Sequence, residues 1–172
     1  EDNRVRKLDY SIQLSALFYQ RFIDNGKITL FSPHDVAGLY DSFGTESFDE
    51  LYVKYENDDS IPKTQVDAQE LILDLLKERA ETGRIYIMNI DHCNSHSSFT
   101  DKVEMSNLCQ EITLPTKPVQ HIDDEHGEIA LCILSAINIG KIRDVSDLET
   151  LCDLSVRSLD ELIDFQGYPV KA

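Results

Sequence analysis

Long apolar runs and basic blocks are both missing from this sequence of 172 residues. No apolar stretch approaches the roughly 20 residues that a helix needs to cross a bilayer, and residues 1–10 lack the apolar core of a secretion signal. We therefore expect a cytoplasmic protein without a membrane span. The formal net charge of −16 and the scattering of the 16 Lys and Arg residues disfavour nucleic acid as a partner.

Closely spaced cysteine pairs are missing as well. The cysteines Cys93, Cys109, Cys132 and Cys152 include no C-x-x-C pair, so a disulfide framework is not expected. A free thiol is by default a small buried apolar group, and Cys152 fits this interpretation best because it stands among leucines of a predicted helix. Cys132 lies in an apolar run, so we expect it deep in the protein, either as inert packing or as an interior redox partner.

No repeat, low-complexity tract or Gly/Ser linker divides the chain, which favours one domain. Apolar spacing predicts helices at 9–24, from Ser32, at 46–57, at 65–82 after a Thr64 cap, and at 147–165 after a Ser146/Glu149 capping box. Short apolar segments predict strands at 27–31, 84–89 and 107–114, whereas 129–139 fits either a strand or a helix. Helices that alternate with buried strands indicate an α/β fold with parallel pairing.

Three residues of different chemistry alternate in "SNLCQEITLPTKP" (106–118). On an extended segment Asn107, Cys109 and Glu111 share one face, at about 6.6 Å per two-residue step. An amide, a thiol and a carboxylate in a row are costly to bury without partners, and together they can bind, carry radical or nucleophilic chemistry, and move protons. A site and a merely solvated edge strand remain equally good interpretations of this alternation.

Two nearby clusters allow weaker alternatives. His92, Cys93 and His96, together with Cys109, could form a zinc site, but only the two histidines have ligand spacing, so a turn held by side-chain hydrogen bonds is favoured. The acidic segment 121–130 is best interpreted as a solvated loop, because it lacks the calcium-binding D-x-D-x-D-G pattern.

A family resemblance rests on these same segments. "SNLCQEITLPTKP", together with "ERAETGRIYIMNIDHCNSHSSF" (78–99) and "DEHGEIALCILSAINIG" (124–140), closely resembles the large, catalytic subunit of aerobic class I ribonucleotide reductase. The likeness extends over essentially the whole chain. It implies reduction of ribonucleoside diphosphates to deoxyribonucleoside diphosphates for DNA replication, within a ten-stranded α/β barrel of which residues 1–172 would be the central portion.

The resemblance also implies roles for individual residues. Cys109 would become a transient thiyl radical, Glu111 would take the proton of the substrate 3′-hydroxyl, and Asn107 would hydrogen-bond the ribose. Leu108 and Gln110 would complete the substrate-binding loop. Cys132, in "GEIALC", would be one of two cysteines that reduce the 2′ carbon and end as a disulfide.

Several family features have no match in the sequence. We expect the second reducing cysteine, the nucleotide-sensing region for ATP and deoxynucleotide effectors, the radical-relaying tyrosines and the cysteine tail to lie elsewhere. The expected partners are the remainder of the large subunit, a small subunit with a diiron-tyrosyl radical, and thioredoxin or glutaredoxin, and no metal is expected in this chain. The remaining alternatives are a non-catalytic assembly role and the zinc module.

Overall fold

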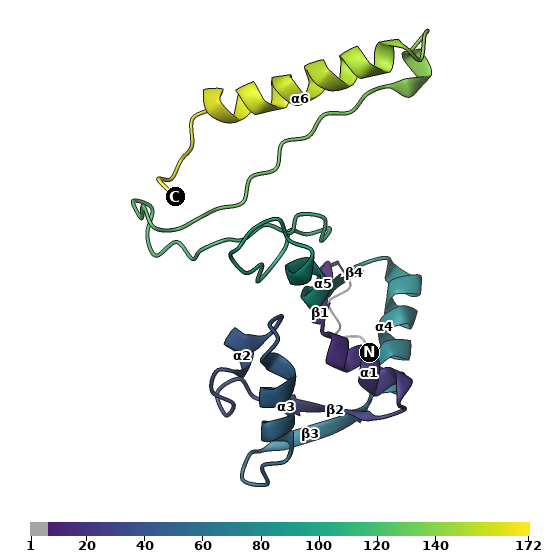
Figure 1. Ribbon diagram of the computed structural model, residues 1–172. Helices are drawn as coiled ribbons and strands as arrows, with labels where there is room; N and C mark the ends of the chain where they lie inside the picture. The colour runs from purple at the N-terminus through teal and green to yellow at the C-terminus, as the bar shows by residue number, and fades with distance from the viewer. Residues whose placement is uncertain (1–6) are drawn as a thin grey trace. The chain divides into compact units, whose positions relative to one another are not determined.

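The computed structural model describes residues 7–172 (Figure 1). These residues divide into two compact units on either side of the bond between Pro115 and Thr116. Each unit has its own packing, and no Gly/Ser linker in the sequence marks the division between them. Among the described residues, no helix is long and apolar enough to span a membrane.

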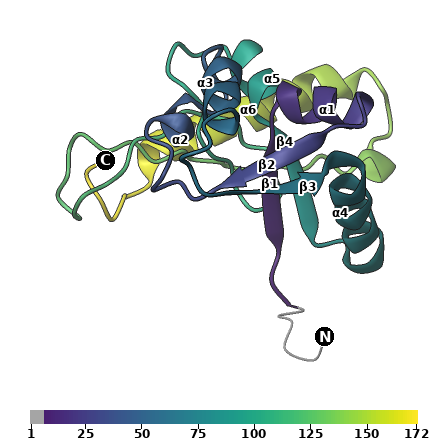
Figure 2. The same cartoon turned by 90° about the horizontal axis from the view of Figure 1, so that it is seen from below.

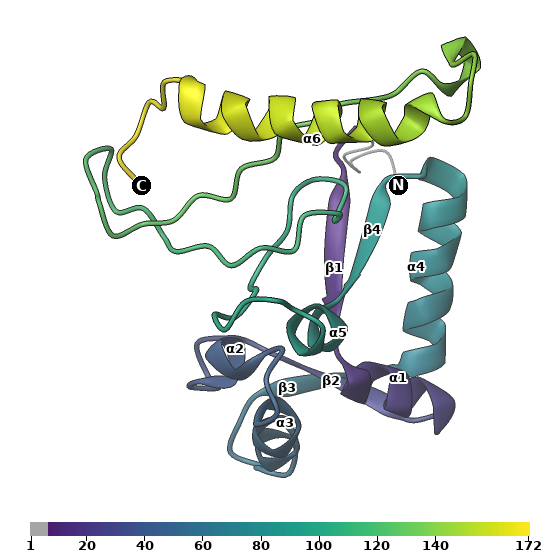
Figure 3. The ribbon, with the colours of Figure 1, turned by 45° about the horizontal axis from the view of Figure 1, so that its top comes forward.

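The first unit is built on a parallel strand pair. β1 (Tyr10–Leu14) runs beside β4 (Ile85–Asn89), and α4 (Ala68–Thr82) lies along β4 (Figure 3). This confirms the predicted strand at 84–89 and the predicted parallel pairing. The predicted helix at 9–24 is wrong in its first half, because these residues pair with β4, and the helix begins only at Ala16, after the Ser15 hydroxyl caps it.

The first unit also contains a separate pair of antiparallel strands, one of which was not predicted from the sequence. β2 (Lys27–Phe31), which confirms the strand expected there, pairs with β3 (Lys63–Asp67) (Figure 2). The hydroxyl of Tyr52 accepts a hydrogen bond from the Thr29 amide at 2.6 Å and donates one to the Thr29 carbonyl at 2.9 Å. Burial raises the pKa of Tyr52, so this phenol stays a neutral donor that fixes the strand against α3 (Phe48–Glu56).

The helix that follows β3 is shorter than predicted. α4 (Ala68–Thr82) is capped by Asp67, whose carboxylate accepts hydrogen bonds from the first amides of the helix, so the predicted Thr64 cap is wrong and Thr64 lies in β3. Gly83 ends α4 in the left-handed conformation. Of the apolar residues on this helix, Ile72 is buried, whereas Leu76 is exposed.

The remaining helices of the first unit are short. They are α1 (Ala16–Ile23), α2 (Leu39–Ser42), α3 (Phe48–Glu56) and α5 (Ile90–Ser95). The helix expected at 46–57 is confirmed, but the one expected from Ser32 is wrong, because the chain there forms turns in which the Asp35 amide bonds the Ser32 carbonyl. Met88, Ile90 and Val103 are buried together, and this cluster joins β4 and α5 to the segment that leads into residues 106–112.

The second unit contains a closed loop and one long helix. The Lys117 and Glu128 backbones exchange hydrogen bonds of 3.0 and 3.1 Å, and their side chains form an ion pair. Inside this loop the Asp124 carboxylate accepts hydrogen bonds from the backbone amides of Gln120 and His126, and these bonds hold the pKa of Asp124 below its usual value. The acidic residues around Asp124 therefore belong to an ordered turn.

The helix α6 (Asp147–Phe165) has the predicted bounds. Its capping box is not formed, because Ser146 has a helical backbone conformation and makes no side-chain cap hydrogen bond. Residues 129–138 form neither of the predicted elements and run as irregular extended chain, with Ser135 hydrogen-bonded to Ser155 of α6 at 2.5 Å. The expected burial of Cys132 and Cys152 is wrong, since both are exposed.

A close glycine contact fixes the connection between α2 and α3. Gly44 has φ +79°, and a Cβ atom there would lie 2.6 Å from Cγ1 of Ile90 and 2.9 Å from Nδ2 of Asn94. We expect Gly44→Ala to destabilise the subunit by roughly 2–4 kcal/mol, because strain and overpacking add. Gly83→Ala is the matched control: it has φ +67° but nothing within 4 Å, so it should cost only about 1 kcal/mol. Equal shifts of the two urea midpoints would contradict the contact.

Candidate active site

The segment that carries the candidate catalytic residues is anchored before it begins. The Asn94 side chain of α5 accepts a hydrogen bond from the Val103 amide at 2.7 Å and donates one to the Val103 carbonyl at 3.1 Å. Gln13 of β1 donates to the Glu104 carbonyl at 2.9 Å. Two side-chain amides thus replace the backbone partners that a strand would supply, and Val103 is fully buried beneath them.

Residues 106–112 form an irregular loop, so the strand predicted at 107–114 is wrong. Leu108 and Cys109 lie in a turn that the Gln110 amide closes on the Asn107 carbonyl at 3.2 Å. Gln110 has φ +66°, a left-handed conformation that costs a residue with a Cβ atom roughly 1–2 kcal/mol. The alternation of a strand is therefore broken between Cys109 and Glu111.

Side chains at the two ends of this loop hold it closed. The Ser106 hydroxyl lies 2.5 Å from the Ile112 carbonyl oxygen and 3.2 Å from Oδ1 of Asn107, and Oδ1 also accepts the Ile112 amide at 3.1 Å. We call Ser106, Asn107 and Ile112 the loop clamp. Its geometry uses the Asn107 oxygen within the protein and leaves the amide nitrogen of this side chain as the group that can donate to a ligand.

The central residues of the loop are open to a ligand. Leu108, Cys109 and Glu111 are exposed, whereas Gln110 folds back so that its Nε2 donates to the Asn107 carbonyl at 3.0 Å. The Gln110 Oε1 atom is buried without a hydrogen-bond partner among the residues that the structure describes. The loop thus presents a thiol and a carboxylate outward on a constrained turn.

Sequence reasoning missed Tyr86, which neighbours the thiol. Tyr86 lies on β4, and its electrostatic interaction with Cys109 is the largest cause of its raised pKa. The Arg79 guanidinium lies 5.9 Å from the centre of the Tyr86 ring. No short motif joins Tyr86 to Cys109, because the contact depends on how β4 and the loop pack.

Cys132 belongs to the second unit, while Asn107, Cys109 and Glu111 share one loop of the first. The structure therefore brings three of the four predicted catalytic residues together within one unit. The predicted neighbours Leu108 and Gln110 lie on the same loop.

The residues proposed for the zinc alternative do not converge. Cys93 packs against the buried cluster around Met88, and burial raises the pKa of its thiol. His92 and His96 are exposed and stack edge to face, with 5.9 Å between ring centres. Across residues 7–172, no three His, Cys, Asp or Glu side chains are grouped to hold a metal.

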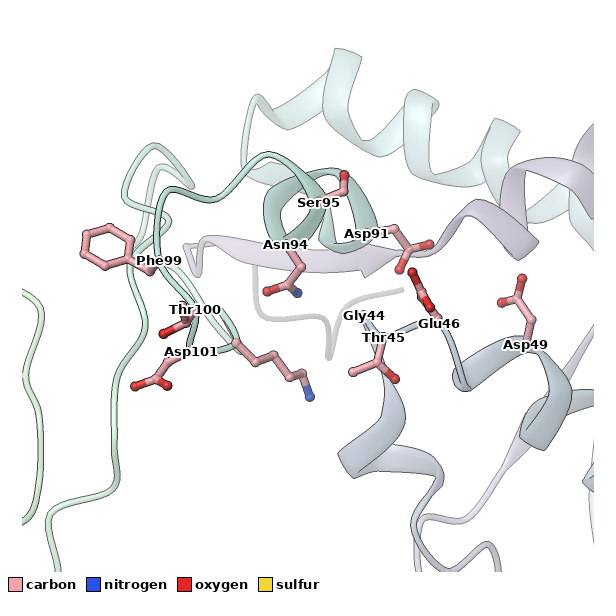
Figure 4. Close-up of a pocket in the computed structure, with 11 residues that line it drawn as sticks. Gly44, Thr45, Glu46, Asp49, Asp91, Asn94, Ser95, Phe99, Thr100 and Asp101 are labelled. Atoms are coloured by element: carbon pink, nitrogen blue, oxygen red, sulfur yellow. The ribbon is translucent and has the colours of Figure 1, made fainter.

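A pocket of about 480 Å³ lies beside α5. Glu46, Asp49 and Asp91 stand at one end of it and Asp101 at the other (Figure 4). Burial, and then the negative charge of Asp91, raise the pKa of Asp49. These four carboxylates outnumber the single basic residue of the lining, Lys102, so the pocket is a poor site for an anionic ligand.

Comparison with known proteins covers the whole chain. A family model described as "Ribonucleotide reductase, barrel domain" matches residues 1–172. The alpha subunit of ribonucleoside-diphosphate reductase from Haemophilus influenzae is 60% identical over 177 residues, which cover 100% of this chain and 23% of that protein. The phage T4 alpha subunit is 42% identical over 178 residues, covering 99% and 23%. The alpha subunit of ribonucleoside-diphosphate reductase 1 from Escherichia coli is 56% identical over 124 residues, which cover 69% of this chain and 16% of that protein.

The class of structure that these matches define is an α/β barrel domain. The chain belongs to the family of ribonucleotide reductase barrel domains. This confirms the family and the α/β barrel class predicted from the sequence. The chain spans about a quarter of the length of these relatives, at 23% of the Haemophilus influenzae protein.

Proposed function

We propose that this chain is part of a ribonucleotide reductase catalytic subunit and contributes its radical-bearing thiol to the reduction of ribonucleoside diphosphates. The observation that carries the proposal is the Cys109 loop, where Asn107, Cys109 and Glu111 lie together inside the matched barrel domain. The relatives named above are ribonucleoside-diphosphate reductases, and this supports the diphosphate as the substrate class.

The exposed side chains of the loop suit three separate roles. Cys109, as a thiyl radical, takes the hydrogen atom from C3′ of the ribose and later returns it, so that its S–H bond forms and breaks once per turnover. Glu111 accepts the 3′-hydroxyl proton, for which an exposed carboxylate is a suitable base. Asn107 donates its amide hydrogens to the ribose, since its oxygen accepts the Ile112 amide.

Two thiols supply the electrons for the 2′ carbon. We assign one to Cys132 and the other to a cysteine outside this segment, because neither Cys93 nor Cys152 matches the family motif. The 2′-hydroxyl leaves as water, a hydrogen replaces it, and the two sulfurs end joined as a disulfide. Thioredoxin or glutaredoxin then restores the thiols, and a cytoplasmic location suits this exchange.

The remaining parts of the enzyme lie outside this segment in the proposal. The family's diiron-tyrosyl radical belongs to a small subunit and supplies the oxidising equivalent that converts the Cys109 thiol into a thiyl. Among residues 7–172, no three His, Cys, Asp or Glu side chains are grouped so that they could bind a metal ion. ATP and deoxynucleotide effectors are likewise assigned to other regions, and the remainder of the large subunit completes the ten-stranded barrel around the central portion.

The proposal is tested with the complete large subunit, its small subunit and a dithiol reductant. We expect conversion of CDP to dCDP, and we expect Glu111→Gln to lower kcat by about 100-fold because the amide cannot accept the 3′-hydroxyl proton. Glu104→Gln is the matched control, an exposed carboxylate of the same segment. Association of the subunits without any CDP reduction would favour the non-catalytic assembly role.

A further inference from the structure

The positions of Cys109 and Glu111 depend on few contacts. Residues 107–111 contain no helix or strand, and Leu108 and Cys109 are exposed, so packing does not hold the turn. Within it, the described hydrogen bonds run from the Gln110 amide and side chain to the Asn107 carbonyl. The left-handed Gln110 shows that the turn is not the conformation such a chain prefers by itself.

The loop clamp supplies the missing constraint. Ser106 contacts both the Ile112 carbonyl, at 2.5 Å, and the Asn107 side chain, at 3.2 Å. Its hydroxyl therefore joins the residue before the turn to the residue after it and also orients the carboxamide that bonds the Ile112 amide. Ser106 is half-buried, which shields these hydrogen bonds from competing water.

We propose that Ser106 is a positioning residue that sets where the Cys109 sulfur and the Asn107 amide nitrogen meet the ribose. This inference rests on the proposed function, because it assigns Ser106 to the same site. Ser106 touches no reacting atom in this role; it acts through the Asn107 side chain and the Ile112 backbone. A displacement of about 1 Å between reacting atoms is enough to cost roughly 100-fold in rate.

Three variants of the complete subunit test the role. Ser106→Ala removes the hydroxyl, Ser106→Thr retains it, and Ser98→Ala removes an exposed hydroxyl from the preceding loop. We expect Ser106→Ala to lower kcat for CDP about 10- to 100-fold with KM within about twofold, because Ser106 does not itself contact the substrate in this role. Ser106→Thr should recover most of the loss, and Ser98→Ala should match the wild type.

A kinetic isotope effect separates positioning from poor folding. A misfolded fraction lowers kcat but leaves the effect of 3′-deuteration unchanged, whereas a displaced sulfur slows hydrogen transfer and makes the isotope effect on kcat larger. We expect a larger isotope effect for Ser106→Ala than for Ser106→Thr. A lowered kcat with an unchanged isotope effect, or a kcat equal to that of Ser98→Ala, overturns the proposal for Ser106.

The two proposals fail differently. If the wild type reduces CDP and Cys109→Ser does not, but Ser106→Ala matches Ser98→Ala, the proposed function stands and only the role of Ser106 is wrong. A wild-type subunit that does not reduce CDP overturns both proposals.

Discussion

Cys109→Ser is expected to abolish CDP reduction by the complete subunit. An oxygen side chain gives up and recovers a hydrogen atom with difficulty, so the hydrogen transfer that the thiol performs is lost. A barrier raised by more than about 5.4 kcal/mol lowers the rate more than about 10⁴-fold, which places the remaining activity below detection. The measurement is dCDP formed per subunit over time, with the small subunit and reductant in excess.

The structure explains why this substitution should leave the loop intact. The clamp joins Ser106, Asn107 and Ile112 without using the Cys109 side chain, and serine is close to cysteine in shape. CDP should therefore bind to Cys109→Ser as to the wild type. Cys93→Ala is the control, because that thiol packs in the cluster around Met88 and has no assigned role in turnover. Retained dCDP formation in Cys109→Ser would refute the radical role.

Local signals predicted the elements whose ends are marked in the sequence itself. Gly83 ends α4, and the bounds of β2 (Lys27–Phe31) and α6 (Asp147–Phe165) follow from local composition and spacing. The segment Tyr10–Leu14 could not be assigned in this way, because its apolar spacing fits a helix as well as a strand. Its conformation depends on pairing with β4, whose residues follow some seventy positions later.

At the candidate site, too, the sequence predicted residue types but did not predict their geometry. The alternation of Asn107, Cys109 and Glu111 selected the residues that the proposed function uses, but the strand that it predicted does not form, because the chain turns at Gln110. Asparagine and serine side chains compete with regular pairing by bonding nearby backbone groups, and the Asn107 oxygen does so on the Ile112 amide. The proximity of Tyr86 to Cys109 depends on tertiary packing, so no local sequence pattern predicts it.

The second unit shows what an apolar pattern does not specify. The run around Cys132 and the helix around Cys152 predicted burial, yet both thiols are exposed within the described residues. An apolar sequence pattern predicts which surface is buried, but it does not predict which element covers that surface. In the proposed function the rest of the barrel is that element, so Cys132 meets the Cys109 loop only in the complete subunit.

Cys132→Ser is expected to stop steady-state CDP reduction as completely as Cys109→Ser, but at a later step. Without the Cys132 thiol the two-electron reduction of the 2′ carbon has no donor pair, although Cys109 can still remove the 3′ hydrogen. CDP carrying tritium at C3′ should therefore release tritium to water through the exchangeable Cys109 thiol, whereas Cys109→Ser should release none. Cys152→Ser, an exposed thiol of the same unit, is the control and should behave as wild type.

The pair of readouts assigns each cysteine to its step. Loss of dCDP with continued tritium release places Cys132 after hydrogen abstraction, because the radical reaches the substrate and the reduction alone fails. Loss of both would place Cys132 in radical transfer or in the structure of the loop, and undiminished dCDP formation would remove it from the chemistry. The structure places Cys109 on a clamped loop of one unit and Cys132 on irregular chain of the other. We therefore expect the loss of hydrogen abstraction and the loss of 2′ reduction to be separable by single substitutions.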